Sequence, residues 1–361
     1  MNIYTMMVAL LLLLGYMMNG TREKNGKYVL VGCVLLFCIY GLRNAFKIGD
    51  DSTNTYYGGF LATGNYSWGE LMALDIPNKG YYVMNKIMFS LTGGDYQLYI
   101  TILSGFVICC LGYIVYEYSP DPLQSFLYFL GMLYFTFHFS ALKQSVAMAV
   151  LMLAFDQIFK KRLVLFLLLV ALAGTFHFPA LVFLPAYWLA KIHLGRIYMF
   201  ILAAMLILVF IFRNQIITFM MNLYKDTDAE IDLSGVRFLR NKVLIMITIV
   251  GVAVMFRVPM RDDQLYEGLL GFMGLSIVFQ TFSGYNNIFE RLADYYFQFS
   301  VIFIPMVFDH RATRKSLLQW RSLAVLDSAS PYLFCGFGIW RFLSYVTNVS
   351  TFTPFYFFFQ S

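Results

Sequence analysis

Long runs of apolar residues, separated by short polar segments, follow one another from one end of the chain to the other. Most runs are about 15–20 residues long, and a helix needs about 20 apolar residues to cross the ~30 Å hydrocarbon layer of a membrane. The pattern therefore predicts an all-α, polytopic membrane protein, a single domain over 1–361 with about twelve transmembrane helices in a range of ten to thirteen. The predicted spans are 2–18, 28–42, 96–118, 123–139, 141–158, 163–178, 179–190, 197–213, 243–257, 265–282, 293–308 and 322–340.

Two longer polar stretches interrupt this series, at 43–95 and 214–242. Within the first, the apolar segment 81–92 is too short to span a membrane, so we expect an interfacial or re-entrant helix there. The short loops decide the orientation, because cytoplasmic loops carry an excess of Lys and Arg. The basic loops are 19–27, 160–162, 191–196, 257–261 and 311–321. If these are cytoplasmic, both long stretches and both termini lie on the outer side.

Composition supports this class of protein. Hydrophobic residues make up 60% of the chain and charged residues 13%, about half of the ~25% charge that is usual in soluble domains. The net charge of +6 comes from Lys and Arg at the ends of apolar runs, so nucleic acid is not an expected partner. The five cysteines lie inside apolar runs without metal-ligand spacing, and no nucleotide-binding motif is present, so no metal or cofactor is expected.

Several charges are predicted at the outer boundary. Lys143 lies just inside a predicted span, where a bare charge is costly; it either reaches outward to the lipid headgroups or faces a cavity that binds an anion. Arg43 and Asp51 follow the second span, and Arg291 lies at the mouth of another. The carboxylates beside Arg291, Glu290 and Asp294, could instead form a salt bridge with it.

Two phrases, "FHFSAL" at 137–142 and "FHFPAL" at 176–181, place His138 and His177 at the outer ends of two predicted helices. We expect His138 to be an interfacial helix end. Outer cations near a histidine or carboxylate suit a lipid that carries phosphate, because Arg and Lys bind phosphate and the other groups can accept a proton. These residues do not decide between glycan transfer from a lipid pyrophosphate and transport of an anionic substrate.

Three stretches resemble the EpsG family of Wzy-like polysaccharide polymerases. They are "GLRNAFKIGDDSTNTYYGGF", "ALKQSVAMAVLMLAF" continuing to "FHFPA", and "ERLADYYFQFSVIFIP", and the closing "TFTPFYFFF" is similar to the family's aromatic C-terminus. The positions that match the family pattern are Arg43, Asp51, Tyr56, Lys143, Gln144, His177, Arg291 and Tyr295. Lys143 stands where the family has Arg, and Asp50 could take the place of Asp51, because the spacing to Tyr56 is one residue longer than the family's.

The resemblance implies a membrane glycosyltransferase of exopolysaccharide, capsule or O-antigen biosynthesis at the outer face of the bacterial inner membrane, independent of nucleotide sugars. The growing glycan would pass from undecaprenyl pyrophosphate to the next lipid-linked repeat unit. Arg43, Lys143 and Arg291 would hold the pyrophosphate, while His177 or Asp51 would act as the base; Tyr56, Gln144 and Tyr295 would bind substrate. A chain-length regulator protein is an expected partner. A flippase for the same lipid-linked oligosaccharide and an O-antigen ligase remain the alternatives.

Overall fold

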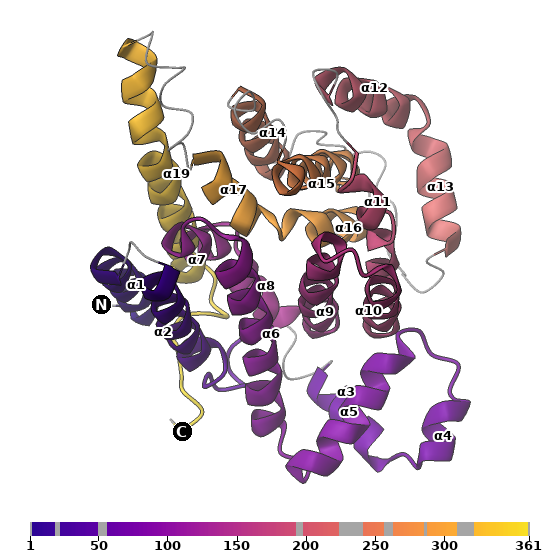
Figure 1. Ribbon diagram of the computed structural model, residues 1–361. Helices are drawn as coiled ribbons and strands as arrows, with labels where there is room; N and C mark the ends of the chain where they lie inside the picture. The colour runs from indigo at the N-terminus through magenta and orange to yellow at the C-terminus, as the bar shows by residue number, and fades with distance from the viewer. Residues whose placement is uncertain are drawn as a thin grey trace. The chain divides into compact units, whose positions relative to one another are not determined.

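Helices account for nearly all of the described chain (Figure 1). The computed structural model describes residues 2–18, 22–49, 56–192, 198–223, 241–255, 263–284, 287–308 and 321–359. Within these ranges no β-strand forms, apart from an isolated antiparallel bridge between Arg43 and Phe357. The predicted all-α class is confirmed for this part of the chain.

Two described helices, α6 (Tyr96–Tyr118) and α9 (Leu142–Phe159), are long and apolar enough to cross a membrane by length and composition. Their bounds lie close to the predicted spans 96–118 and 141–158. The other apolar helical segments among the described residues are 10–17 residues long. The number of spans and the membrane placement of the first long loop stay predictions.

The described helices belong to two compact units. The first, 1–181 with 304–361, contains α1 (Ile3–Met18), α2 (Arg22–Tyr40), α3 (Gly58–Asn65), α4 (Trp68–Ala73), α5 (Lys79–Thr92), α6, α7 (Pro122–Gly131), α8 (Tyr134–Ser140), α9, α10 (Leu163–Phe176) and α19 (Arg321–Asn348). The second, 182–303, contains α11 (Ala186–Leu189), α12 (Tyr198–Ile211), α13 (Arg213–Leu223), α14 (Asn241–Met255), α15 (Gln264–Thr281) and α16 (Asn287–Phe297). The 3-10 helix Phe178–Phe183 and α17 (Ser300–Phe308) cross the two boundaries.

The first long loop is helical over much of its length, in α3, α4 and α5. Helix α4 begins with a capping box, in which Ser67 Oγ accepts from the Glu70 backbone N–H and the Glu70 carboxylate accepts from the Ser67 N–H. The backbone hydrogen bond from Ser67 lowers the pKa of Glu70. Helix α5 ends where Gly93 adopts a left-handed φ of 62°, a conformation that glycine takes without penalty.

Helix α5 buries two polar side chains beside its core-facing aromatic and methionine side chains and exposes two aliphatic ones. Asn85 and Lys86 are buried, whereas Ile87 and Leu91 are 45% and 73% exposed. The Lys86 ammonium donates to the carbonyls of Gly64 and Tyr66 at the end of α3, where the last carbonyls of a helix lack intrahelical partners. These hydrogen bonds explain how a lysine side chain can be buried on this helix.

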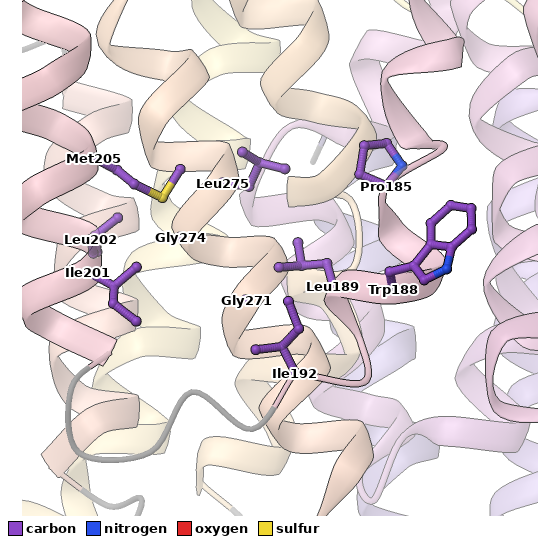
Figure 2. Close-up of a pocket in the computed structure, with 10 residues that line it drawn as sticks. All are labelled: Pro185, Trp188, Leu189, Ile192, Ile201, Leu202, Met205, Gly271, Gly274 and Leu275. Atoms are coloured by element: carbon purple, nitrogen blue, oxygen red, sulfur yellow. The ribbon is translucent and has the colours of Figure 1, made fainter.

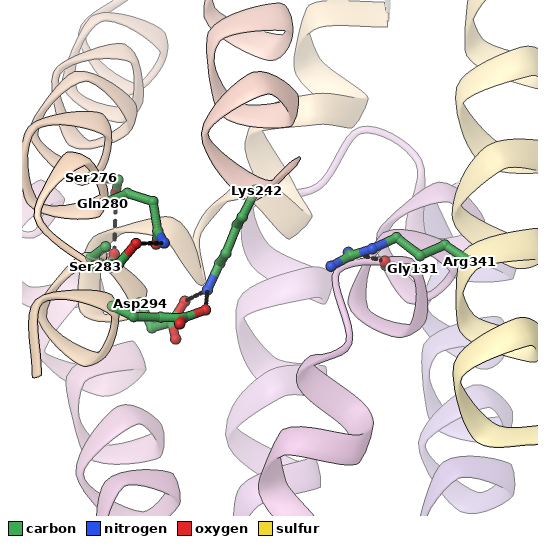
Figure 3. A network of polar contacts seen from close by, with 9 residues as sticks. Gly131, Lys242, Ser276, Gln280, Ser283, Asp294 and Arg341 are labelled. Atoms are coloured by element: carbon green, nitrogen blue, oxygen red, sulfur yellow. Dashed lines mark hydrogen bonds and ion pairs between the residues drawn. The ribbon is translucent and has the colours of Figure 1, made fainter. Parts of the chain in front are cut away.

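Two predicted spans are broken. The prediction of one helix over 123–139 is wrong, because α7 ends at Gly131 and α8 begins at Tyr134, with Leu133 at a left-handed φ of 66°. The guanidinium of Arg341 donates to the Gly131 carbonyl at 2.7 Å (Figure 3), which satisfies an acceptor that the break leaves open. Likewise, the predicted span 293–308 is divided between α16 and α17.

The second unit also departs from prediction. The expected span 179–190 consists of a 3-10 helix and the single turn α11, in a segment that contains Pro179 and Pro185, and proline interrupts α-helical hydrogen bonding. The outer loop 214–242 begins inside α13 rather than as loop. Helices α14, α15 and α16 pack together, and the Tyr296 hydroxyl donates to the Val182 carbonyl at 2.6 Å.

Candidate functional site

Arg43, which follows α2, is a fully buried cation in the first unit. Its side chain is 1% exposed, and the guanidinium donates to the Tyr40 carbonyl and to Ser104 Oγ. The guanidinium carbon lies 4.8 Å and 4.6 Å from the ring centroids of Tyr40 and Phe139. No carboxylate among the described residues forms an ion pair with it, so its charge is held by aromatic faces, a hydroxyl and a carbonyl.

The segment after α19 holds the backbone around Arg43 in place. The Asn44 N–H donates to the Tyr356 carbonyl at 2.8 Å, and the Phe358 N–H donates to the Leu42 carbonyl at 3.0 Å. These bonds form the bridge between Arg43 and Phe357. The aromatic stretch that resembles a family feature therefore packs directly beside the first motif, although more than 300 residues separate them in sequence.

Lys143 lies in the first turn of α9 and extends its ammonium toward α5. Its Nζ donates to the Tyr82 hydroxyl at 3.0 Å and lies 4.7 Å and 5.4 Å from the ring centroids of Tyr82 and Tyr81. The side chain is half-buried, and no described carboxylate pairs with it. The ammonium is thus fixed by two tyrosines, which sequence analysis did not single out.

A buried polar network lies beneath these tyrosines. The Tyr99 hydroxyl donates to Asn85 Oδ1 at 2.8 Å and lies 3.4 Å from the Tyr81 hydroxyl. All three residues are at most 1% exposed. Buried amides and hydroxyls are costly unless they are hydrogen-bonded, so the bond from Tyr99 to Asn85 Oδ1 favours the rotation of α5 that places Tyr82 next to Lys143, while Asn85 Nδ2 has no partner in the described part of the chain.

His177 ends α10 close to the start of α5. The side chain is 7% exposed, and the next residue, Phe178, donates its N–H to Asn78 Oδ1 at 2.7 Å. Gly80 permits this contact: a Cβ built there would lie 2.2 Å from Thr175 Oγ1 and 2.5 Å from Thr175 Cβ. One short helix, α5, therefore positions both the Lys143 ammonium and the His177 segment.

Two further predicted residues lie within the first unit. Tyr56 packs edge-on against Tyr81, with ring centroids 6.1 Å apart, and both rings belong to an aromatic cluster that includes Phe60, Tyr96 and Tyr99. Gln144, next to Lys143 on α9, is buried. The predicted base Asp51, and Asp50 as its alternative, lie outside the described residues.

Arg291 and Tyr295 belong to α16 in the second unit. Arg291 is exposed and Tyr295 is fully buried. Lys242 at the start of α14 pairs with both carboxylates, Glu290 and Asp294, at 3.1 Å and 2.7 Å (Figure 3); a salt bridge between either of them and Arg291 stays a prediction. Sequence analysis did not single out Lys242. This residue stands at the start of an apolar run, and the sequence alone does not show which distant carboxylates it contacts.

The expectation that His138 is an interfacial helix end is wrong. Its side chain is 1% exposed, and its ring stacks on Phe129 with centroids 5.8 Å apart. Neither ring nitrogen has a hydrogen-bond partner in the described part of the chain. In the second phrase, by contrast, the residue after the histidine is hydrogen-bonded to Asn78 just before α5.

The described residues contain no group of three or more His, Cys, Asp or Glu that could hold a metal ion. The first unit contains two cations, Arg43 and Lys143, that form no ion pair with a described carboxylate. The motifs that carry them also contain tyrosine hydroxyls and a histidine. Such a set can bind an anion by charge and hydrogen bonds together.

The model of the EpsG family matches residues 27–328, which is most of the chain. The chain therefore belongs to the EpsG family, a family of Wzy-like polymerases. No curated protein and no solved structure matches it. Family membership and the apolar helical fold together indicate a membrane protein with a polymerase-like role in polysaccharide biosynthesis.

Proposed function

We propose that this protein polymerises lipid-linked oligosaccharide repeat units at the outer face of the bacterial inner membrane. Membership of the EpsG family supports the class of reaction. The observation that carries the proposal for this chain is the environment of Lys143 and Arg43, cations held by aromatic rings and neutral polar groups rather than by described carboxylates. Lys143 is half-buried, so its charge is available to an anionic substrate, whereas the charge of Arg43 lies buried within the same unit.

In the proposed reaction, a sugar hydroxyl of the incoming repeat unit attacks the anomeric carbon of the growing glycan. A new glycosidic bond forms, the bond between the anomeric carbon and the pyrophosphate oxygen breaks, and undecaprenyl pyrophosphate leaves. Lys143 and Arg43 stabilise the departing charge, and the family resemblance assigns the same role to Arg291. His177 or Asp51 accepts the proton of the attacking hydroxyl, and Tyr56, Gln144 and Tyr295 contact the glycan or the pyrophosphate.

The proposal includes the basic loops on the cytoplasmic side, both termini outside, and a chain-length regulator as partner. Exopolysaccharide, capsule and O-antigen are all possible products of the same chemistry. The alternatives, a flippase and a ligase, act before and after polymerisation, so loss of each leaves a different intermediate.

The test is a strain that lacks this protein and carries either the wild-type chain or a variant, with the glycans separated on gels by length. Loss of a polymerase leaves single repeat units on the outer face; loss of a flippase retains them on the cytoplasmic leaflet; loss of a ligase leaves long glycan on its lipid carrier. We expect His177→Ala to yield single units outside. Wild-type polymer length in both His177→Ala and Lys143→Ala would overturn the site assignment. Lys27→Met, at an exposed lysine in a surface ion pair, is the control.

A further inference from the structure

The hydrogen bond between Lys143 and Tyr82 has a fixed direction. A lysine ammonium has three N–H donors and no acceptor, so the Tyr82 hydroxyl oxygen, 3.0 Å from Nζ, accepts this bond. The hydrogen of that hydroxyl is then left for another acceptor, and in the described part of the chain the Tyr82 hydroxyl makes no other hydrogen bond. The pair can therefore donate from the phenol O–H and from the remaining ammonium N–H groups at once.

Both side chains of this pair are half-buried, so a ligand can reach them from the surface. The Tyr82 ring is held by the Lys143 ammonium, 4.7 Å from its centroid, and by the Tyr81 ring, 5.8 Å away between centroids. The bond from Tyr99 to Asn85 Oδ1 favours the rotation of α5 on which this contact depends. The donors are thus positioned before a substrate arrives, which lowers the entropic cost of binding.

A second Lys–Tyr pair, at the other end of α9, shows what distinguishes the first. Lys160 Nζ donates to the Tyr113 hydroxyl at 2.9 Å and lies 5.7 Å from the centroid of its ring. The Asp156 carboxylate lies 2.8 Å from the same ammonium, so this charge is balanced within the chain. Lys143 forms the same bond to a tyrosine but no ion pair with a described carboxylate, so an anion from outside the chain is a suitable partner for it.

The apolar cavity of the second unit does not offer such donors (Figure 2). Its volume is about 440 Å³, and none of the ten residues that line it has a charged side chain. An anion that enters an apolar site without partners loses its hydration without compensation. The chemistry that a phosphate-bearing group requires is therefore found at the Lys143–Tyr82 pair and not in this cavity.

We propose that Tyr82 donates a hydrogen bond directly to an oxygen of the carrier pyrophosphate, beside the oxygen that Lys143 binds. The inference rests on the proposed function, in which Lys143 stabilises that leaving group. The oxygens of an ionised pyrophosphate are acceptors, so two neighbouring donors match two of them. Tyr82 keeps its proton, because the pyrophosphate leaves as an anion, and the hydrogen bond strengthens as negative charge develops on the oxygens. Tyr82 is thereby a substrate-binding residue and not only a support for Lys143.

Tyr82→Phe tests this inference, because it removes the hydroxyl and keeps the ring against which Lys143 packs. The measurement is the binding of undecaprenyl pyrophosphate to the full chain in phosphatidylcholine nanodiscs. We expect the apparent affinity to fall about tenfold or more, because a hydrogen bond to a charged group is lost. Tyr113→Phe makes the same change in the pair whose lysine is bound to Asp156 and should leave the affinity unchanged. An unchanged affinity in Tyr82→Phe, or the same loss in Tyr113→Phe, would overturn the inference.

Two further ligands distinguish the headgroup of the carrier from other lipids. Undecaprenol has the same chain without the pyrophosphate, and dioleoyl phosphatidate carries a phosphate on an ordinary phospholipid. Tyr82→Phe should change the affinity for neither. A comparable loss with undecaprenol would show that the hydroxyl acts through the fold, and a comparable loss with phosphatidate would show a general contact with phospholipid headgroups; either result would refute the assignment.

A tyrosine fluorinated beside its hydroxyl, placed at position 82, distinguishes donation to the substrate from support of Lys143. Fluorine makes the phenol a stronger hydrogen-bond donor and a weaker acceptor. The affinity for undecaprenyl pyrophosphate should therefore be kept or increased if Tyr82 donates to it, and a fall would show that the hydroxyl only accepts from Lys143. This replacement keeps the hydroxyl, so it tests the inference even if Tyr82→Phe does not fold.

The inference and the proposed function can fail separately. Weaker binding of undecaprenyl pyrophosphate in Tyr82→Phe, in a protein whose wild-type chain does not restore polymer to the deletion strain, would refute the function and keep the contact with Tyr82. Restored polymer together with unchanged binding in Tyr82→Phe would refute the contact and keep the function.

Discussion

The contact between Gly80 and Thr175 gives the sharpest test of how α5 supports the site. In Gly80→Ala, the new methyl carbon would lie 2.2 Å from Thr175 Oγ1, 2.5 Å from its Cβ and 3.0 Å from its carbonyl carbon. Carbon atoms pack at about 3.5–4.0 Å, so rotating the hydroxyl away does not relieve the overlap with Cβ. Helix α5 must move away from α10 by about 1 Å.

The expected cost follows from this displacement. Overpacking typically costs about 1–3 kcal/mol, and losing the hydrogen bond from Phe178 to Asn78 adds about 0.5–1.5 kcal/mol. Replacing glycine by alanine in a helix returns at most about 1 kcal/mol, and less in the first turn. We therefore expect Gly80→Ala to lower the free energy of unfolding by about 1–3 kcal/mol and to shorten or abolish the polymer.

A double-mutant cycle distinguishes the loss of the contact between Gly80 and Thr175 from nonspecific destabilisation. Thr175→Gly in the Gly80→Ala background removes both the Oγ1 and Cβ atoms and should restore most of the lost stability and polymer length, a coupling that a double-mutant cycle measures. Gly59→Ala, where a built Cβ meets nothing within 4 Å, is the matched control. Thermal unfolding of the purified protein and glycan gels are the assays. The reasoning is refuted if Gly80→Ala behaves as wild type, or if Thr175→Gly restores neither property.

Three further predictions concern other parts of the chain. Lys143→Met should reduce polymer yield at least about tenfold on glycan gels, whereas Lys143→Arg should keep part of the activity, because the charge that faces the substrate is retained; equal loss in both would argue against a role for charge. Lys242→Met should lower stability by about 2–4 kcal/mol in thermal unfolding, because two carboxylates lose their cation, and adding Asp294→Asn should recover part of that loss; an unchanged melting temperature would contradict this ion pair. Deleting residues 353–361 should expose the backbone near Asn44 to protease, since both interstrand hydrogen bonds are lost; unaltered protection would show that the bridge is not needed.

Much of the fold can be predicted from the apolar runs. Each helix satisfies its own backbone hydrogen bonds, so the length of an apolar run predicts the length of the helix. Helices α6 and α9 therefore lie within a residue of their predicted bounds. Breaks are harder to predict: the interruption at Leu133 is stabilised by Arg341, which is about 200 residues away, and no local signal marks it. One helix of the long loop was predicted in part, as the amphipathic segment 81–92, but the sequence did not show that Asn85 and Lys86 would be buried.

The site was predicted in part. Motif resemblance located Arg43, Lys143 and His177, because charge and spacing are properties of the sequence. It did not reveal Tyr82, Asn85 or Gly80, whose roles depend on which helix faces which. A tyrosine in an aromatic-rich chain, or a glycine at the start of a helix, carries no signal until its neighbour in space is known.

The pairing of the last aromatic segment with the backbone at Arg43 has a consequence for biosynthesis. Residues 356–358 follow every helix in the described part of the chain, so the ribosome makes them after those helices have been synthesised. The segment around Arg43 is synthesised early, and residues 356–358, with which it pairs, are synthesised much later. A chain whose synthesis stops before residue 352 would possess each helix of the first unit yet lack the clamp on Arg43. The backbone beside Arg43 thus acquires its last two hydrogen-bond partners only after the described helices have been made.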